Sequence, residues 1–227
     1  MLPAIMSDTA DLTLDEIRVH LAPGIAANAA FDGWGDAARD MAADGAADGG
    51  NIDRDVARLA LPSALAMIDA WFADINSRMA AAYSPEALAA MKIRQRITAL
   101  VEARLDAMAP DREALRRALA VLALPQNLAA AARLAWRTAD RIWRLAGDTA
   151  VDYNHYTKRA TLLAVYGSTI AVFLDDESEG LADTRAFLAR RIDGLMRFEK
   201  AKAGILRRAA DRPSFSRFVG RLRYPAT

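Results

Sequence analysis

Apolar residues recur at helical spacing along this chain, and almost no stretch alternates with the period of two that marks a β-strand. Positions i, i+3, i+4 and i+7, interrupted by Gly and Pro, predict an all-α protein of about nine or ten helices. Three short helices are expected first, over 13–22, 34–43 and 53–61. Thr13 opens the first with a capping box, and Pro23 is expected to stop it. This order is that of a helix-turn-helix unit.

Longer amphipathic segments follow the three short ones. The expected helices cover 63–83, 86–108, 111–122, 127–147, 152–173 and 183–196. We therefore divide the chain into a three-helix head (1–61), a helical body for ligand binding and dimerisation (62–202) and a basic amphipathic tail (203–227).

Composition narrows the class of protein. The 227 residues are 53% hydrophobic, which is enough for a globular core. Cysteine is absent and histidine occurs only at 20 and 155, so the sequence excludes a disulfide framework and predicts no metal site. No run approaches the roughly 20 apolar residues of a membrane span, and the first residues lack the features of a signal peptide. We expect a soluble protein of a reducing compartment.

Motifs for catalysis are weak. Gly33-Trp34-Gly35-Asp36-Ala37-Ala38 matches G-x-G-x-x-A, but no strand precedes it as a dinucleotide-binding motif requires. The acids at 175–177 fall between helices, where we expect them to be solvated. Asp152 and His155 form an i, i+3 pair without an evident nucleophile. We predict no catalytic residue and no enzymatic activity.

The distribution of charge opposes DNA binding. Residues 1–60 hold four arginines against eleven acids, a net charge of −7, whereas 185–227 hold twelve basic residues against three acids. Proteins bind duplex DNA largely by neutralising phosphates with Lys and Arg. The segment 51–58, where a recognition helix would begin, carries two acids beside its two arginines. We expect no nucleic-acid partner.

The segment 143–159 is the most informative. A helix that begins before Trp143 ends at Gly147, and Asp152 caps the next. Asp152 then shares one helix face with three later side chains, those of His155, Tyr156 and Arg159. That face suits recognition of a partner, but a helix corner whose polar groups only cap and pair fits the pattern equally well.

The motif W-x-x-A-G-D from Trp143, followed by D-x-N-x-Y-T-x-R from Asp152, resembles the signature of the COQ9 family of ubiquinone-biosynthesis proteins. The likeness continues through 164–169, the acidic loop at 175–178 and 183–192. The head resembles the DNA-binding domain of TetR-type regulators. His155 stands where many family members have Trp.

This resemblance implies a TetR-like fold that has lost DNA binding. It also implies a dimeric lipid-binding accessory factor that presents prenylated quinone intermediates to a demethoxyubiquinone hydroxylase-type enzyme. Such a protein would lie in the cytoplasm, peripherally associated with the inner membrane of a bacterium. No cofactor is expected beyond a bound phospholipid or prenylated quinone. The alternative is a TetR-type transcriptional regulator with an apolar ligand.

The resemblance assigns roles to the residues of segment 143–159. The partner-binding patch would comprise Asp152, His155, Tyr156, Arg159 and Trp143. Two further residues, Gly147 and Asp148, would shape the corner.

Apolar positions supply the remaining expectations. Candidates to line a lipid cavity, or simply to fill a core, are Leu65, Phe72, Leu100, Leu134, Trp136, Leu163 and Phe173. Candidates for membrane contact, unless the tail packs on the body or is disordered, are Phe215, Phe218, Val219 and Leu222 opposite Arg217, Arg221 and Arg223. TetR-like bodies usually pair through their last helices, so the helix with Phe187, Ile192 and Leu195 is the expected dimer interface.

Overall fold

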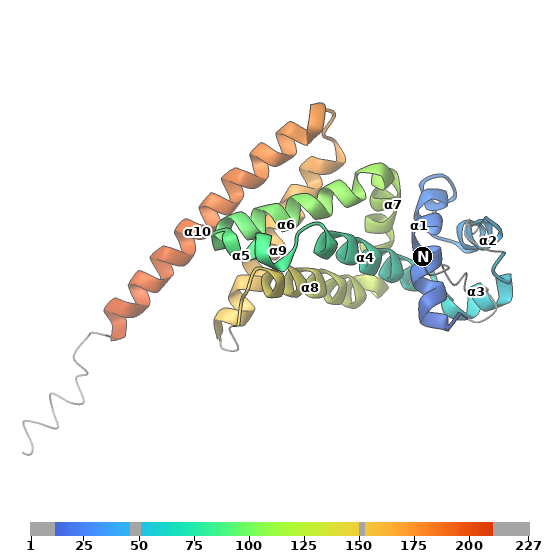
Figure 1. The fold of residues 1–227 in the computed structure, drawn as a ribbon, viewed down its shortest axis with the longest axis horizontal. Helices are drawn as coiled ribbons and strands as arrows, with labels where there is room; N and C mark the ends of the chain where they lie inside the picture. The colour runs from blue at the N-terminus through green and yellow to red at the C-terminus, as the bar shows by residue number, and fades with distance from the viewer. Residues whose placement is uncertain (1–11, 46–50, 150–152, 211–227) are drawn as a thin grey trace, which may run out of the picture.

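The computed structural model describes residues 12–45, 51–149 and 153–210, and within these ranges every regular element is helical (Figure 1). The predicted all-α class is confirmed. Candidate residues Asp152, Phe215, Phe218, Val219 and Leu222 lie outside the described residues.

The head contains α1 (Leu14–Asp32), α2 (Asp36–Asp44) and α3 (Arg54–Ala60). The predicted capping box is present: Thr13 Oγ1 accepts from the Glu16 backbone N–H at 3.3 Å, and the Glu16 carboxylate accepts from the Thr13 N–H at 2.8 Å. Asp53 caps α3 by accepting from the backbone N–H groups of Asp55 and Val56 at 2.8 and 3.1 Å. Both helix starts are therefore fixed by local side chains.

The predicted end of the first helix at Pro23 is wrong, because α1 runs through it to Asp32. Proline removes one helical hydrogen bond, but the buried face of α1 continues beyond it with Ile25 and Ala29. Gly24 also lets α2 approach closely, since a Cβ at that position would lie 3.3 Å from Ala42 Cβ. Packing on this face outweighs the local breaker.

The body begins with α4 (Ala64–Ala81) and α5 (Pro85–Ala90). It continues with α6 (Ile93–Met108), α7 (Arg112–Leu122), α8 (Leu128–Leu145), α9 (Tyr153–Leu174) and α10 (Ala182–Ala210). Short 3₁₀ turns occupy 109–111, 125–127 and 179–181.

The single helix expected over 86–108 is wrong. The chain is extended at Met91 and Lys92, which separate α5 from α6. Arg96 fixes this break by donating to the carbonyls of Ala89 and Met91, both at 2.9 Å. The sequence between the two helices holds no Pro or Gly, so the break has no local signal.

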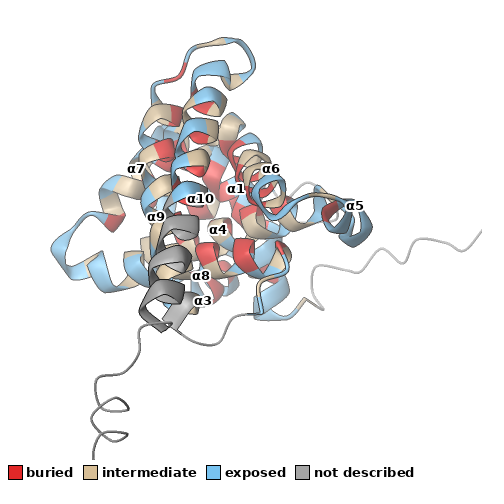
Figure 2. Cartoon of the chain, turned by 90° about the vertical axis from the view of Figure 1, so that its left-hand side faces the viewer, coloured by how far each residue is buried: buried red, intermediate tan, exposed pale blue. Residues whose placement is uncertain are grey.

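Head and body share one continuous core. Helix α1 packs on α4 and α7, and the Trp34 indole of the head donates to the Ala114 carbonyl of α7 at 3.0 Å. The rings of Trp34 and Trp71 lie 5.4 Å apart. Figure 2 shows the buried residues gathered on the inward faces of the helices.

Helix α10 extends away from the body at the end opposite the head (Figure 1). It continues without interruption past residue 203, where we placed the start of the tail. Two of the predicted dimer-interface residues, Ile192 and Leu195, are instead buried within the monomer, whose α9 packs on α10. Phe187 is half-buried beneath the Arg191 guanidinium, 4.8 Å from its ring centroid.

No single helix in the described ranges has the length and apolar character to cross a membrane. The pairs α3–α4 and α6/α7–α8, bent by 79° and 94°, meet those criteria only when each pair is taken together.

Candidate ligand pocket and partner surface

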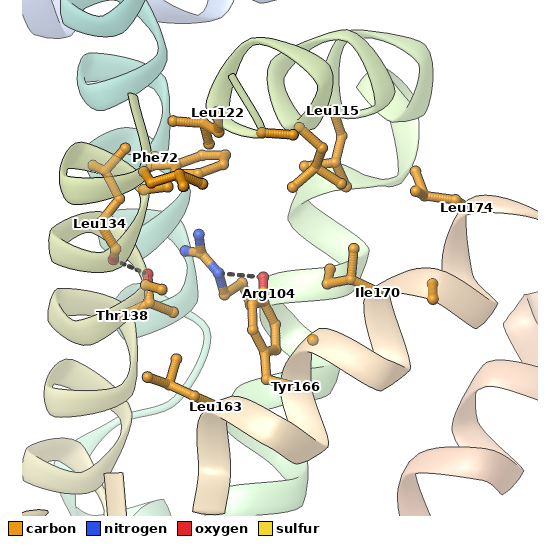
Figure 3. A pocket seen from close by; sticks show the side chains of 17 residues that line it. Phe72, Arg104, Leu115, Leu122, Leu134, Thr138, Leu163, Tyr166, Ile170 and Leu174 are labelled. Atoms are coloured by element: carbon orange, nitrogen blue, oxygen red, sulfur yellow. Dashed lines mark hydrogen bonds between the residues drawn. The ribbon is translucent and has the colours of Figure 1, made fainter. Parts of the chain in front are cut away.

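An apolar pocket of about 520 Å³ lies between α4, α6, α7, α8 and α9 (Figure 3). Hydrocarbon side chains make most of its wall. Among them are Phe72 from α4, Leu115 and Leu122 from α7, Leu134 from α8 and Leu163 from α9. Pockets for small apolar ligands have this size and this kind of lining.

Three of the seven predicted cavity residues, Phe72, Leu134 and Leu163, line this pocket. The other four do not line it, because periodicity marks an apolar face without showing whether that face lines a cavity or fills a core. Leu100 and Phe173 are fully buried in the core, Leu65 lines a separate pocket of about 320 Å³, and Trp136 lies near the corner between α8 and α9.

One charged side chain, that of Arg104, lines the pocket and was not predicted. It is 1% exposed. Its Nε donates to the Tyr166 hydroxyl at 2.8 Å and its Nη1 to Asn76 Oδ1 at 2.5 Å. Arg104 lies on the buried face of α6, four residues after Leu100 and four before Met108. The sequence signal that could have identified Arg104 is a positively charged residue on an otherwise apolar helix face.

The corner after α8 has the expected form. Gly147 adopts φ +90°, and its N–H donates to the Arg144 carbonyl at 3.0 Å, while the Asp148 N–H donates to the Trp143 carbonyl at 2.9 Å. This is a Schellman motif with glycine at its left-handed position. The Trp143 indole donates across the corner to the Lys158 carbonyl at 3.0 Å.

Arg159 does not lie on an exposed face, which corrects its assignment to the partner-binding patch. It is buried between α8 and α9, where its guanidinium pairs with Asp140 at 2.7 Å and with Asp148 at 3.1 Å. Asp148 also pairs with Lys158 at 2.7 Å. The pattern placed Arg159 on the same helix face as Tyr156, but the packing of α9 on α8 covers this end of the face.

Beside the corner, three rings from α8 and α9 form an aromatic cluster: Trp136, His155 and Tyr156. Their centroids lie 5.2 to 6.4 Å apart. Tyr156 is 62% exposed, and the other two are half-buried. Of the predicted patch, His155 and Tyr156 lie in this cluster together with Trp136, whereas Trp143 is buried and does not belong to an exposed patch.

The similarity to known proteins lies in the part of the chain that holds the corner and the aromatic cluster. The COQ9 family profile matches residues 128–199. The chain carries a COQ9-family domain. Over 96 residues it is 40% identical to the human protein named "Ubiquinone biosynthesis protein COQ9, mitochondrial" and 41% identical to the rat protein of that name. These alignments cover 42% of this chain and 30% and 31% of those proteins, so the chain matches about a third of the length of its relatives.

The fold has a counterpart among solved structures. A TetR transcriptional regulator from Nitrosomonas europaea superposes with a TM-score of 0.61 and 25% identity, covering 78% of this chain and 96% of that one. The predicted TetR-like fold is confirmed.

The COQ9 domain comprises α8, α9 and the first part of α10. It therefore contains the corner, the aromatic cluster and one wall of the pocket. The opposite wall, with Phe72 and Arg104, comes from helices before the domain.

Within the COQ9 domain, Asp176 does not behave as the solvated acid we predicted. It is buried, and its carboxylate accepts four hydrogen bonds, two from Ser178 and two from Thr184, at 2.5 to 2.8 Å. Burial alone would raise the pKa of Asp176, but these hydrogen bonds outweigh it and hold the pKa well below its ordinary value. The acid fixes the start of α10. Across the described ranges, no three His, Asp or Glu side chains gather as a metal site.

The arginines of the head, four in its described part, each pair with an acid of the head itself. Arg18 lies 3.5 Å from Asp15, Arg39 2.8 Å from Asp36 and Arg58 3.0 Å from Asp55, and Arg54 bonds Asp44. The bond from Arg54 also lowers the pKa of Asp44.

Proposed function

We propose that this protein is a non-enzymatic, lipid-binding accessory protein of ubiquinone biosynthesis, which holds an apolar quinone intermediate and presents it to a partner hydroxylase. The observation that carries the proposal is the apolar pocket of about 520 Å³, one wall of which belongs to the COQ9 domain. Its relatives are named as proteins of ubiquinone biosynthesis, which indicates the pathway.

The chemistry of such intermediates explains why a pocket would help. An isoprenoid tail is insoluble in water, and its burial is favourable by about 25 cal/mol per Å² of apolar surface. Side chains from five helices surround this pocket with hydrocarbon, including Leu115, Leu134 and Ile170. They offer a tail the same environment as a lipid bilayer while leaving the protein free to dock on an enzyme.

The aromatic cluster is our candidate docking surface for a demethoxyubiquinone hydroxylase-type enzyme. Exposed Tyr and Trp side chains contribute strongly to protein interfaces, because each buries a large area at a small entropic cost. Trp136 holds the Tyr156 ring at 6.0 Å between centroids, so the patch is partly ordered before binding.

A homodimer and peripheral contact with the inner membrane from the cytoplasmic side complete the proposal. Membrane contact would fall to the tail residues Phe215, Phe218, Val219 and Leu222.

Native mass spectrometry of protein purified from its own host, followed by lipid extraction, tests the ligand. A prenylated quinone or phospholipid on a dimer is expected. Gly167 lines the pocket, and a Cβ there would meet nothing within 4 Å, so Gly167→Leu should fill the pocket and reduce bound lipid several-fold. Gly194→Leu, on α10 with equally open space, is the control. Equal lipid in both variants would contradict a role for this pocket.

Co-purification with the hydroxylase tests the docking surface. Tyr156→Ala should weaken the complex at least ten-fold, whereas Phe31→Ala, which removes an even more exposed aromatic ring from the head, should leave it unchanged. Equal loss in both variants, or in neither, would argue against docking at the aromatic cluster.

A TetR-type regulator with an apolar ligand is the second candidate. It is favoured by the Nitrosomonas europaea structure, 96% of which is covered by this chain. The internal pairing of the head's arginines opposes it, and the test by DNA binding is argued in the Discussion.

A further inference from the structure

Arg104 differs from the other buried arginines in its counter-charge. Among the described residues three arginines are buried: Arg39, Arg104 and Arg159. Arg39 pairs with two aspartates at 2.8 and 2.9 Å, and Arg159 with two at 2.7 and 3.1 Å. The described part of the chain gives Arg104 no carboxylate within ion-pair distance; its hydrogen bonds go to the neutral side chains of Tyr166 and Asn76.

These neutral partners leave most of the guanidinium's capacity unused. A guanidinium has five N–H donors, and the bonds to Tyr166 and Asn76 engage Nε and one donor of Nη1. The rings of Phe72 and Tyr166 lie 5.5 and 5.7 Å away and contribute weaker cation–π attraction. Burying a charge without an opposite charge is strongly unfavourable.

The unused donors belong to a residue that lines the pocket. Figure 3 shows the Arg104 guanidinium among the lining side chains, between Phe72 and Tyr166. The hydroxyl of Thr138, a further polar group of the wall, donates to the Leu134 carbonyl of its own helix at 3.2 Å. Arg104 is therefore the group able to select a ligand by its head.

We infer that Arg104 recognises an anionic oxygen head group, so that this pocket accepts, beside the neutral quinone of the proposed function, an amphiphile with one apolar tail and a carboxylate or phosphate head. The inference rests on the proposed function in one respect, that the pocket holds an apolar tail. An oxyanion supplies the missing opposite charge and accepts two parallel hydrogen bonds from the planar guanidinium. Tyr166 and Asn76 are positioning residues, since their side-chain oxygens accept hydrogen bonds from the guanidinium and fix its orientation.

The size of the pocket favours a single tail. A volume of about 520 Å³ falls within the range of sites that enclose one drug-sized ligand. The lining is hydrocarbon from α7, α8 and the far end of α9, so a tail can extend away from Arg104 toward Leu122 and Leu174.

The test compares probes with the same twelve-carbon tail at pH 7.5, by calorimetry on the full chain after lipid removal. The probes are dodecanoate, dodecyl phosphate and dodecanol, each below its critical micelle concentration, with decylubiquinone as a neutral quinone. The wild-type protein should bind at least one of the two anions about ten-fold or more tighter than dodecanol. The tighter anion identifies the source of the head group, carboxylate or phosphate.

Arg104→Met should reduce the ratio of anion affinity to dodecanol affinity to near one while dodecanol still binds. Arg104→Lys should retain part of the preference for the anion. Arg112→Met is the matched control, because Arg112 also lies over a ring, that of Phe173 at 4.9 Å, but does not line the pocket. It should leave the ratio unchanged.

The outcomes separate the two proposals. Equal affinity of wild-type protein for anions and dodecanol, or an unchanged ratio in Arg104→Met, would overturn the role of Arg104 while leaving a lipid-binding pocket. Failure of all four probes to bind would instead refute the pocket's role in the proposed function. The wild-type comparison holds even if the Met variant does not fold.

Discussion

Arg159 of α9 pairs with Asp148, which follows α8, at 3.1 Å between Nη1 and Oδ2, and neither side chain is more than 4% exposed. Each residue has a second partner, Asp140 for Arg159 and Lys158 for Asp148, both at 2.7 Å. Arg144 also pairs with Asp140, and the resulting network of five charges joins α8 to the beginning of α9. It holds in place the helix ends that carry the aromatic cluster, so the corner and the candidate docking surface form one structural unit.

Removing the buried arginine should destabilise the protein strongly. Arg159→Met leaves Asp148 and Asp140 with less compensation in a buried site, which we expect to lower the free energy of unfolding by about 3 kcal/mol. Arg144→Met removes a partner from the same Asp140, but the Arg144 side chain is 68% exposed. That control should cost under about 1 kcal/mol. Urea denaturation of both variants measures the difference, and similar losses would refute a special role for Arg159.

The glycine of the corner should also be sensitive to substitution, though less so than Arg159. Gly147 has φ +90°, and a Cβ there would lie 3.0 Å from Arg96 Nη1, which donates to the Ala146 carbonyl. Gly147→Ala should therefore cost about 1–2 kcal/mol. Gly194→Ala, inside α10 with nothing near its Cβ, should instead stabilise by up to about 1 kcal/mol. Thermal unfolding of the pair tests the prediction, which would fail if both substitutions shifted Tm in the same direction.

Local signals allowed much of the fold to be predicted from the sequence. The capping box at Thr13 and the glycine after α8 each act through neighbouring residues, so their positions could be recognised without a structure. The prediction failed where distant contacts decide. Helix α1 continues through Pro23 because α2 and the core pack against it. The helix expected over 86–108 breaks at Met91, where Arg96 binds the freed carbonyls.

The candidate site was predictable only in part, for the same reason. Helical spacing placed Arg159 beside Tyr156, but only the packing of α8 decides which of them is buried. The composition of an apolar face does not show where a wall stops and a cavity begins, so Leu100 and Phe173 were grouped with Phe72. Arg104 went unrecognised because its significance lies in a missing counter-charge, which only the surrounding side chains reveal.

The buried carboxylate of Asp176 should make stability depend on acid pH. Its pKa in the folded protein is lowered, so its contribution is fully present above the unfolded value of about 4 and is lost as the pH falls below it toward the folded pKa. Asp176→Asn should cost about 1–3 kcal/mol at pH 7, because an amide cannot accept all four hydrogen bonds.

The difference in the free energy of unfolding between wild type and Asp176→Asn should narrow as the pH is lowered from 4 to 2. Urea titrations at several pH values measure it. Asp175→Asn is the control, since this neighbouring acid is exposed and pairs with Arg116 at the surface. It should change stability by less than about 0.5 kcal/mol at every pH. A difference for Asp176→Asn that stays constant down to pH 2 would contradict the assigned pKa shift.

The head should fail to bind DNA despite its TetR-like fold. Its described arginines are held by acids of the head, and Arg54 and Arg58 of α3, the helix at the position of a recognition helix, bond Asp44 and Asp55. Fluorescence anisotropy with promoter DNA from its own genome should show no specific complex at about 150 mM salt. Specific binding there, weakening with salt as phosphate contacts require, would instead support the regulator hypothesis.

Removing the acids that pair with the arginines of α3 should have the opposite effect and allow some DNA binding. A double variant, Asp44→Asn with Asp55→Asn, releases both arginines of α3 and raises the net charge of the head by two. It should acquire weak, sequence-independent binding at low salt. With two phosphates neutralised, log K should fall with log salt at a slope of about −2. If the variant stays as inert as the wild type, the geometry of the head, rather than its internal ion pairs, is what prevents DNA binding.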